Sequence, residues 1–437
     1  MVFKHAKLAL ALLLAFGGAA RADDFLAGVD YSHLQFFEAR GTLYKENGQI
    51  RDSLDILKDN GINCVRLRLF TSTAAQAQAD PYNYTNNLNY NLPLAVRVKN
   101  AGLKFLLDFH YSDTWADPGH QSTPAAWTNL TFIQLEQQVR SYNSNCIAAF
   151  KAAGAMPDYV QIGNEITSGM LWPSGMVSGS SNTSWSNLGK LMKAAINGVK
   201  DAAGTNVPKI MIHIDRGGDW NTTKWYFDNV SFQQVPFDVI GESYYPFWHG
   251  SLDDLRECLT NAAARYGKPV IVVETAFPWS GTTNLYGIPP TTNGQVQYVS
   301  ALGQILKSIP GGRGAGIFWW GTEYQRLTGY NLAGFDRRSF YSSGTGSPAP
   351  TGEVLPVANA FGQLTAPVLL NASLEGASLE LEWPISGAGM QLTTSTSLAP
   401  IAAWSPVTNS IQSTGSVFST IQPIDDTSAR FYRLQSN

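Results

Sequence analysis

The chain has 437 residues, of which 44% are hydrophobic and 14% are charged, and its formal net charge at pH 7 is −3. This composition indicates a globular protein with a large core, and the small net charge excludes a field that would attract nucleic acid or an anionic membrane. The length fits one large domain of roughly 250–350 residues together with a small one.

The first 22 residues have the features of a secretory signal peptide. Lys4 and Lys7 precede an apolar run over residues 8–16, and the small residues that follow end at Ala22. We expect cleavage after Ala22 and a secreted or periplasmic protein, because the apolar run is too short for a permanent membrane-spanning helix. An uncleaved anchor is the alternative interpretation of this segment.

Eight short apolar runs predict strands that are buried on both faces, because most of them lack the alternation of half-exposed strands. They span residues 25–31, 64–70, 104–110, 159–163, 209–213, 239–243, 269–273 and 315–320. Helical segments lie between them, and each is followed by or ends near a glycine, which commonly stops a helix. These segments span residues 52–60, 92–101, 132–153, 186–203 and 252–266.

This repeated order of strand, helix and strand predicts an α/β fold, a (β/α)₈ TIM barrel over residues 23–364. No glycine-rich phosphate loop follows the first strand, which argues against an open dinucleotide-binding sheet. We expect residues 342–351, which are rich in Gly, Ser and Pro, to form a loop before the last barrel helix.

The amino-acid composition of the chain changes after residue 360. Short apolar alternations in a Ser- and Thr-rich background predict a small all-β, sandwich-like domain over residues 367–437. It could bind carbohydrate, tether the protein to a surface or act as a spacer. Its Trp383 and Trp404 fit a core role and a ligand platform equally well.

The sequence predicts no cofactor and no metal. The three cysteines, Cys64, Cys146 and Cys258, are widely spaced. We interpret them as buried free thiols, because their spacing is not that of a metal site and an odd number leaves at most one disulfide.

Two glutamates follow or end apolar runs: Glu165 after residues 159–163 and Glu274 after residues 270–273. The C-terminal ends of barrel strands meet at one face, where active sites of this fold are built. Two carboxyl groups at that face are the minimum equipment for cleaving a glycosidic bond. The other strand ends also carry polar or aromatic groups, which are costly to bury without partners. These groups are Asp30, Tyr31, Arg66, Arg68, Asp108, His110, Asn164, His213, Asp215, Tyr244, Tyr245, Trp319 and Trp320.

The motifs at these strand ends resemble those of the endo-β-1,4-galactanases of glycoside hydrolase family 53, which cut type I arabinogalactan. The resemblance runs from about residue 25 to about residue 361, and its most specific element is the run at 108–118. The motifs are 28–30 (GVD), 65–68 (VRLR), 108–118 (DFHYSDTWADP), 161–165 (QIGNE), 169–173 (GMLWP), 211–215 (MIHID), 243–247 (SYYPF) and 273–275 (VET).

The resemblance implies a retaining, endo-acting hydrolase with Glu165 as the acid/base and Glu274 as the nucleophile. The residue types agree, because one carboxyl must be protonated and the other ionised, and a nearby arginine favours the ionised form. We therefore expect the two carboxyls to lie about 5–5.5 Å apart. The residues expected to hold the substrate or support the glutamates are Arg66, His110, Trp115, Asp117, Asn164, Trp172, His213, Asp215, Tyr245 and Trp320.

Some of these assignments have alternatives. Arg68 could be only a structural partner of an acidic residue, His213 and Asp215 could brace the fifth strand, and Trp319 is more typical of barrel core. The residues at 276–292 include no Asp, Glu or His, so the calcium site of some family members is not carried over. The run at 319–323 also departs from the Glu-Pro that often follows the tryptophan in this family.

The predicted function is hydrolysis of β-1,4-galactan by a monomer without a nucleic-acid partner or membrane anchor. Another retaining barrel glycosidase, such as a xylanase or mannanase, is the first alternative. A catalytically silent carbohydrate-binding barrel is the second. The sequence leaves open the length of the products, the tolerance of arabinose branches and the choice between periplasm and exterior.

Overall fold

The computed structural model describes residues 25–436 except 180–181, 344–349, 376–377, 400–402, 415–416 and 425–428. The predicted signal peptide, residues 1–22, lies outside the described residues. Among the residues described, no helix combines the length and the apolar character needed to cross a membrane.

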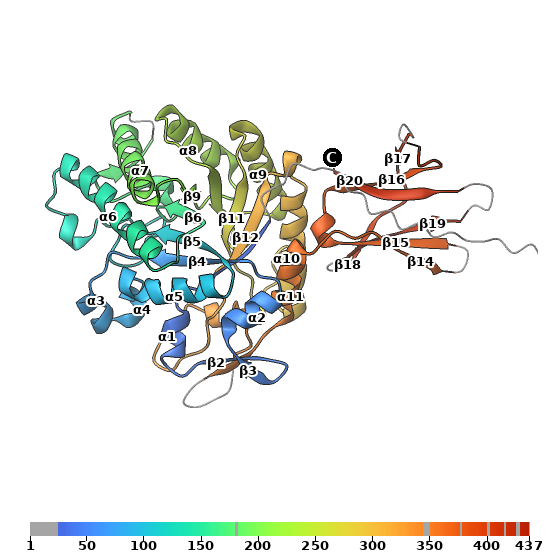
Figure 1. Ribbon diagram of the computed structural model, residues 1–437, viewed down its shortest axis with the longest axis horizontal. Helices are drawn as coiled ribbons and strands as arrows, with labels where there is room; N and C mark the ends of the chain where they lie inside the picture. Colours follow the sequence, from blue (N-terminus) through green and yellow to red (C-terminus); the bar gives the residue numbers. More distant parts are fainter. Residues whose placement is uncertain are drawn as a thin grey trace, which may run out of the picture.

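Eight parallel strands close into a barrel in the order β1-β12-β11-β10-β9-β6-β5-β4 (Figure 1). Their bounds are Leu26–Asp30 (β1), Cys64–Leu69 (β4), Lys104–Phe109 (β5), Tyr159–Ile162 (β6), Lys209–Ile214 (β9), Val239–Ser243 (β10), Val270–Thr275 (β11) and Gly314–Trp319 (β12). Each of the eight predicted strands is present, with ends that differ by at most two residues. The predicted (β/α)₈ barrel is therefore confirmed.

The apolar runs form strands because both of their faces are buried. One cluster takes residues from every barrel strand and fills the barrel interior: Leu26, Cys64, Leu106, Tyr159, Met211, Val239, Ile271, Val273 and Phe318. Neighbouring positions on the same strands, such as Ala27 and Val272, belong to the larger cluster that packs against the helices. The interior is tight, since a Cβ at Gly28 would lie 2.3 Å from the Phe318 ring.

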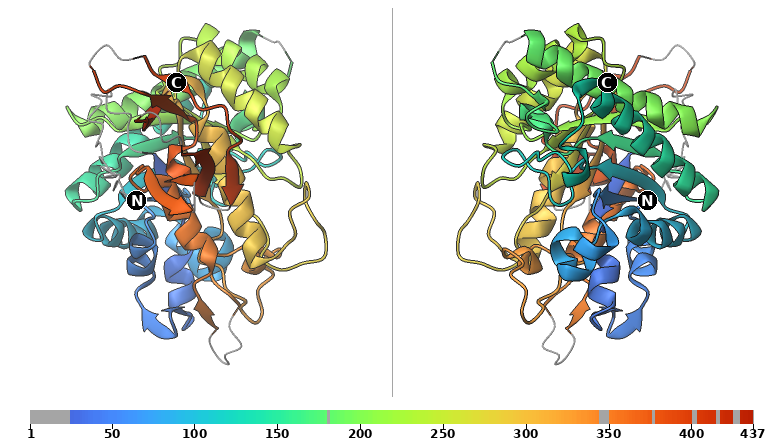
Figure 2. Two further views of the ribbon diagram at one scale, coloured as in Figure 1. Left: turned by 90° about the vertical axis from the view of Figure 1, so that its right-hand side faces the viewer. Right: turned by 90° about the vertical axis from the view of Figure 1, so that its left-hand side faces the viewer.

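Helices surround the barrel (Figures 1 and 2). They are Leu34–Glu38 (α1), Ser53–Asp59 (α2), Ala74–Ala79 (α3), Pro81–Tyr84 (α4), Leu88–Asn100 (α5), Phe132–Ala152 (α6), Asn182–Ala203 (α7), Trp220–Phe232 (α8), Leu252–Tyr266 (α9), Thr292–Lys307 (α10) and Pro356–Gly362 (α11). The sequence signals identified five of these, namely α2, α5, α6, α7 and α9. Side chains fix several starts: the Thr131 and Ser251 side chains each accept a backbone N–H in a capping box.

A small sheet of Leu43–Glu46 (β2), Gln49–Arg51 (β3) and Thr351–Glu353 (β13) was not predicted. Thr351 begins β13 and pairs with Leu43, so the last residue of the expected loop at 342–351 belongs to a strand instead. Residues 344–349 of that loop lie outside the described part of the chain.

The C-terminal region is all β, as predicted. Asn371–Glu375 (β14), Ser378–Pro384 (β15), Val417–Pro423 (β19) and Gln412–Thr414 (β18) form one antiparallel sheet. Ser405–Pro406 (β17), Met390–Ser395 (β16) and Phe431–Ser436 (β20) form a second one. Trp383 is 2% exposed and stacks on Phe418, so it is a core residue. Trp404 is half-buried and lies under the Arg433 guanidinium, 4.1 Å away.

The C-terminal sheets lie against the barrel rather than on a free linker (Figure 1). Ile385, in a short 3₁₀ turn after β15, is 1% exposed and belongs to the hydrophobic cluster of the barrel. Phe418 of β19 packs against both the barrel cluster and the core of the C-terminal sheets. The Gln304 side chain of α10 donates a hydrogen bond of 3.0 Å to Ser413 Oγ. The contact is therefore mainly apolar and centred on α10.

If this contact stabilises the whole chain, truncating Ile385 should destabilise the barrel as well. We expect Ile385→Ala to lower the free energy of unfolding by about 2–5 kcal/mol, because it opens a cavity at a buried site. Ile421, which is 53% exposed on β19, provides the matched control, and Ile421→Ala should change stability by less than about 0.5 kcal/mol. Urea unfolding followed by tryptophan fluorescence measures both, and equal effects would contradict a shared core.

Candidate active site

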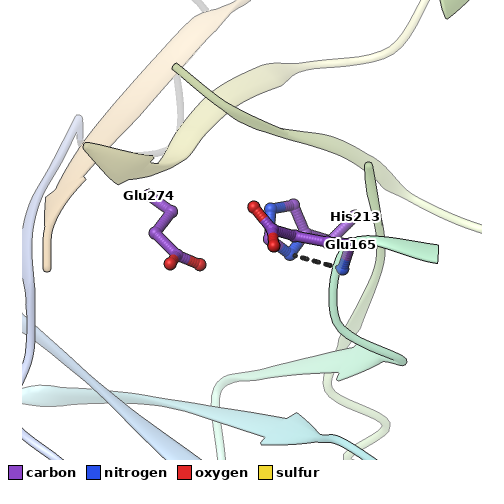
Figure 3. A group of neighbouring side chains, drawn as sticks. All are labelled: Glu165, His213 and Glu274. Atoms are coloured by element: carbon purple, nitrogen blue, oxygen red, sulfur yellow. Dashed lines mark hydrogen bonds between the residues drawn. The ribbon is translucent and has the colours of Figure 1, made fainter. Parts of the chain in front are cut away.

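Two glutamates approach each other at the C-terminal ends of β6 and β11. One carboxylate oxygen of Glu165, one of Glu274 and a ring nitrogen of His213 all lie within 4.8 Å of one another (Figure 3). Glu165 is 9% exposed and Glu274 is 8% exposed. The structure therefore brings together, in a nearly buried setting, the two residues that the sequence pattern singled out.

A tight turn after β6 directs Glu165 into the barrel mouth. Glu165 has a left-handed backbone with φ 51° and ψ 47°, which is uncommon for a residue with a side chain. Gly163 has φ 80°, and a Cβ there would lie 2.6 Å from the Ile166 side chain. The Glu165 backbone N–H donates to His213 Nδ1 at 3.3 Å, and this contact is drawn as the dashed line in Figure 3.

Arg66 on β4 is a fully buried cation surrounded by carboxylates. Its Nη1 lies 3.0 Å from Asp30 Oδ2 and 3.4 Å from Glu274 Oε2, and its Nη2 lies 2.8 Å from Asp108 Oδ2. Burial lowers the pKa of Arg66, but Asp108, Glu274 and Asp30 outweigh this effect and raise it overall. Arg66 therefore stays charged and ties the ends of β1, β5 and β11 together.

The same guanidinium also orients two amides beside the glutamates. Arg66 Nη2 donates to Asn164 Oδ1 at 2.7 Å, and Arg66 Nε donates to Gln161 Oε1 at 3.2 Å. Gln161 Nε2 then donates to Asp108 Oδ1 at 2.6 Å. Asn164 Nδ2 donates to the Ala116 carbonyl at 2.8 Å. Which end of each amide carries the nitrogen is thus set by the neighbouring groups.

Glu274 has two direct partners that offset part of the effect of its burial. Burial, together with Asp30 and Asp108, raises its pKa to about 7, while Arg66 and the Tyr245 hydroxyl act in the opposite direction. Tyr245 donates to Oε1 at 3.0 Å. Oε2 accepts no hydrogen bond from any residue that the structure describes. Glu274 Oε2 is buried and lies 3.4 Å from Arg66 Nη1, so one oxygen is held by a hydrogen bond and the other by an ion pair.

Glu165 has surroundings that favour its protonated form. Burial raises its pKa well above the usual range, and the nearby carboxylates of Glu274 and Asp215 raise it further. The Ser243 hydroxyl, which donates to Oε1 at 2.6 Å, offsets only part of this shift. Because the main cation, Arg66, contacts Glu274 directly and not Glu165, the two carboxyls differ in the way an acid and a nucleophile must.

His110, at the end of β5, is held in one tautomer. Its Nδ1 accepts the backbone N–H of Ala116 at 3.0 Å, so its Nε2 donates to Asp108 Oδ2 at 3.0 Å. Burial lowers the pKa of His110, although Asp108 acts in the opposite direction. His110 is therefore a neutral, oriented donor that supports Asp108 at the edge of the site.

A cavity of about 440 Å³ opens over the two glutamates. Its lining combines aromatic rings with polar and charged groups. It is lined by Arg68, Tyr82, His110, Trp115, Ala116, Asp117, Pro118, Asn164, Glu165, Asp215, Tyr245, Trp248, His249, Glu274, Trp320, Ala333 and Phe335. A cavity with aromatic walls and a few convergent polar groups is typical of a small-molecule or sugar site.

Arg68 contributes to the wall between two tryptophans. Its guanidinium carbon lies 4.3 Å from the centre of the Trp115 ring and 5.3 Å from that of Trp320. Its Nη2 contacts His33 Nδ1 at 2.8 Å, and Asp30 Oδ1 lies 3.6 Å away. Arg68 is therefore both a structural partner of Asp30 and part of the cavity wall.

The cavity includes most of the residues proposed from sequence but not all of them. Arg66 and His213 are fully buried beneath it, where they contact Glu274, Asn164 and Glu165 rather than the open space. Trp172 does not line the cavity; its Nε1 donates to the Ser168 carbonyl at 2.9 Å.

Trp319 is fully buried and donates to the Arg338 carbonyl at 2.7 Å, so it belongs to the barrel core. Asp215 lines the cavity and accepts a hydrogen bond of 2.5 Å from Thr167.

Sequence reasoning missed several members of the site. Ser243 and Trp248 lie in or beside the 243–247 motif, so their position in that motif was the available signal. Trp248 is 65% exposed at the cavity rim and packs on Tyr245, with ring centres 5.3 Å apart. Tyr82 on α4 and Phe335 in a short 3₁₀ helix come from segments distant in sequence, and no local pattern marks them.

The cluster of Glu165, His213 and Glu274 has the spacing of a metal site, but its chemistry fits a carboxyl pair better. Nε2 of His213 contacts Ser243 Oγ at 2.9 Å, and Nδ1 receives the Glu165 N–H. Oε1 of Glu165 and Oε1 of Glu274 each already accept a hydroxyl hydrogen bond. A metal bound through His213 would have to displace one of the hydrogen bonds of that ring.

Comparisons with known proteins agree with the geometry. The profile of the family described as "Glycosyl hydrolase family 53" matches residues 26–349. An arabinogalactan endo-beta-1,4-galactanase of Humicola insolens is 39% identical over 307 residues, which cover 67% of this chain and 88% of that protein. An uncharacterized protein of Niallia circulans is 42% identical over 317 residues, covering 69% of this chain and 84% of that protein.

Two solved structures are also similar. The match to a structure described under fungal beta-1,4-galactanases has a TM-score of 0.67 and 36% identity, covering 77% of this chain and 98% of that one. The match to a GH53 catalytic domain of Ignisphaera aggregans has a TM-score of 0.68 and 33% identity, covering 80% of this chain and 99% of that one.

The raised pKa of Glu165 predicts a stability effect that needs no activity assay. When the pKa of a carboxyl is higher in the folded than in the unfolded chain, stability is lost as the pH rises from the unfolded towards the folded value. Glu165→Gln removes this loss, so we expect roughly 1–3 kcal/mol more unfolding free energy than wild type at pH 8 and no gain near pH 4.

Urea unfolding at the two pH values measures this difference. Glu257→Gln, at an exposed position on α9, is the control and should match wild type at both. A stability gain of equal size at pH 4 and pH 8 would contradict the electrostatic explanation.

Proposed function

The chain belongs to glycosyl hydrolase family 53 and is a glycoside hydrolase, and we propose that it cleaves β-1,4-galactan with retention of anomeric configuration. The observation that carries the mechanism is the carboxyl pair, whose nearest oxygens lie within 4.8 Å. Retaining enzymes place their two carboxyl groups about 5–5.5 Å apart, whereas inverting enzymes leave roughly 6.5–9.5 Å for a water molecule. The short separation supports retention.

In the first step, a carboxylate oxygen of Glu274 attacks the anomeric carbon while Glu165 gives its proton to the departing glycosidic oxygen. The C–O bond breaks and a galactosyl ester forms on Glu274. In the second step, Glu165 takes a proton from water, which attacks the same carbon and releases Glu274. Arg66 and Tyr245 favour this cycle because they stabilise the negative charge on Glu274 before attack and after release.

Asn164 is placed to hold the sugar bound at the glutamates. Its Oδ1 is occupied by Arg66, and one hydrogen of Nδ2 goes to the Ala116 carbonyl. The second Nδ2 hydrogen can donate to the sugar 2-hydroxyl, an interaction that strengthens in the transition state. The rings of Trp115, Trp320 and Trp248 supply apolar surfaces for the sugar faces.

We expect the wild-type protein to cleave linear β-1,4-galactan in preference to xylan and mannan, and to release product first as the β anomer. Glu274→Gln should lower kcat on galactan by at least about 10³-fold, because no covalent intermediate can form. Reducing-end assays measure the rates, and proton NMR reads the anomer. The exposed Glu257→Gln variant should keep wild-type rates. Absence of galactan cleavage, or initial release of the α anomer, would refute the proposal.

The hydrogen bond from Tyr245 to Glu274 predicts that removing the tyrosine hydroxyl will shift the pH profile of kcat/KM. Its hydroxyl donates to Glu274 Oε1 and thereby lowers the pKa of that carboxyl. Tyr245→Phe removes this donor, so the pKa of Glu274 rises and the acid limb of kcat/KM should move to higher pH. The control is Tyr226→Phe on α8, which removes a buried hydroxyl that has no hydrogen-bond partner among the described residues. An unchanged acid limb in Tyr245→Phe would show that Glu274 does not control it.

A further inference from the structure

We infer that His213 and Ser243 form a positioning relay that reserves Oε1 of Glu165 as an acceptor and so keeps the transferable proton on Oε2. This inference rests on the proposed function, in which Glu165 is the acid. The relay spans three adjacent barrel strands, because Glu165 follows β6, His213 lies on β9 and Ser243 ends β10. Neither His213 nor Ser243 lines the cavity.

The tautomer of His213 is set by a neighbouring group that can only donate a hydrogen bond. The Glu165 backbone N–H points at His213 Nδ1 at 3.3 Å, and a backbone N–H only donates. Nδ1 must therefore accept, which leaves the ring proton on Nε2. Gln161 Nε2 also lies 3.0 Å from Nδ1, and it shares its two hydrogens with Asp108 Oδ1 at 2.6 Å and the Gly163 carbonyl at 3.0 Å. Asn164 Oδ1 lies 3.0 Å from Nδ1 as well, but Arg66 at 2.7 Å and Gln161 at 3.3 Å already face its lone pairs.

The direction of the next two hydrogen bonds follows from the tautomer. His213 Nε2 donates to Ser243 Oγ at 2.9 Å. A serine hydroxyl has one hydrogen, which must then go to its other partner, Glu165 Oε1, at 2.6 Å. The opposite tautomer would reverse both bonds and turn the Glu165 proton towards Ser243, away from the cavity.

The direction has a chemical consequence for Glu165. Oε1 is held as an acceptor in both protonation states of the carboxyl, so the acidic hydrogen resides on Oε2. Glu165 lines the cavity, and Oε2 is the oxygen left for the glycosidic bond. Burial and the positive charge of Arg66 lower the pKa of His213 well below its ordinary value, so the ring stays neutral and the relay keeps its direction.

Other ionisable groups near the relay also shift the pKa values of Glu165 and His213, and so they affect the pH dependence of activity as well. Those that act on Glu165 or His213 are Arg66, His110, Asp215, Tyr245, His249 and Glu274. A test of the relay therefore needs a readout that depends on proton donation itself. Leaving groups provide one, because a glycosidic oxygen must be protonated to depart, whereas 4-nitrophenolate departs unaided.

The decisive variant is Ser243→Ala, measured on galactan and on 4-nitrophenyl β-1,4-galactobioside. We expect kcat/KM to fall about 10- to 100-fold on galactan, because the acid is no longer oriented, and less than about 3-fold on the nitrophenyl substrate. The alkaline limb of the galactan profile should move to higher pH, since the lost hydrogen bond stabilised the Glu165 anion. Ser243→Thr, which keeps the hydroxyl, should recover most of the galactan activity.

Each failure has a distinct meaning. Equal losses on the two substrates, or an alkaline limb that moves to lower pH, would overturn the relay. Wild-type protein that does not cleave galactan would contradict the proposed function instead. Ser308→Ala, which removes a hydroxyl bonded to the Ile305 carbonyl at the end of α10, controls for the loss of a serine and should behave as wild type. Thermal unfolding of Ser243→Ala and Ser243→Thr shows that both variants are folded.

Discussion

The arrangement of the site depends on one buried cation, Arg66. A guanidinium with no exposure to solvent is tolerated only when its charge is matched and its hydrogens are used, because an unpaired buried charge is very costly. Arg66 meets this requirement with Asp30, Asp108 and Glu274 as counter-charges and with two amide oxygens as further acceptors. These partners come from different strands, so the requirement to satisfy Arg66 also fixes the relative positions of the strand ends.

The same constraint separates the roles of the two glutamates. Arg66 offers its charge to Glu274 at 3.4 Å, whereas Glu165 receives a neutral hydroxyl from Ser243. Bringing two carboxyls this close raises the proton affinity of the pair, and the one without a direct cation retains the proton. In the proposed mechanism, this one difference in placement distinguishes the acid from the nucleophile, although the two side chains are identical and equally buried.

The strands were predictable from sequence because parallel barrel strands are buried on both faces and therefore appear as apolar runs. The helices were predictable where a glycine followed them. Helix α8 ends without one, since Gln234 adopts the left-handed conformation, with φ 53°, that glycine usually supplies. Helix α10 ends at Lys307, and the residue that caps it, Ser308, has a right-handed backbone.

The glutamates could be identified from sequence because each one directly follows or ends an apolar run, which marks the end of a strand. Ser243 was not identified as a partner of Glu165, because the two residues are 78 positions apart and only the closed barrel brings them together. The sugar contact expected of Trp172 stays a prediction: this side chain does not line the cavity, and its indole N–H donates to the Ser168 carbonyl four residues earlier.

The C-terminal sheets are joined to the barrel through the side chain of Ile385, which packs in the barrel's hydrophobic cluster. A module joined only by a linker would keep its own core and leave the barrel helices exposed to solvent. Here Ile385 is buried in the barrel cluster, and Phe418 is shared between the two cores. Separating the two parts would expose Ile385 to water, at a cost of roughly 1.5–3 kcal/mol, and would remove the contact of Phe418 with the barrel. Any surface to which the module binds is consequently held in a fixed relation to α10, and hence to β11 and Glu274, rather than at the end of a flexible tether.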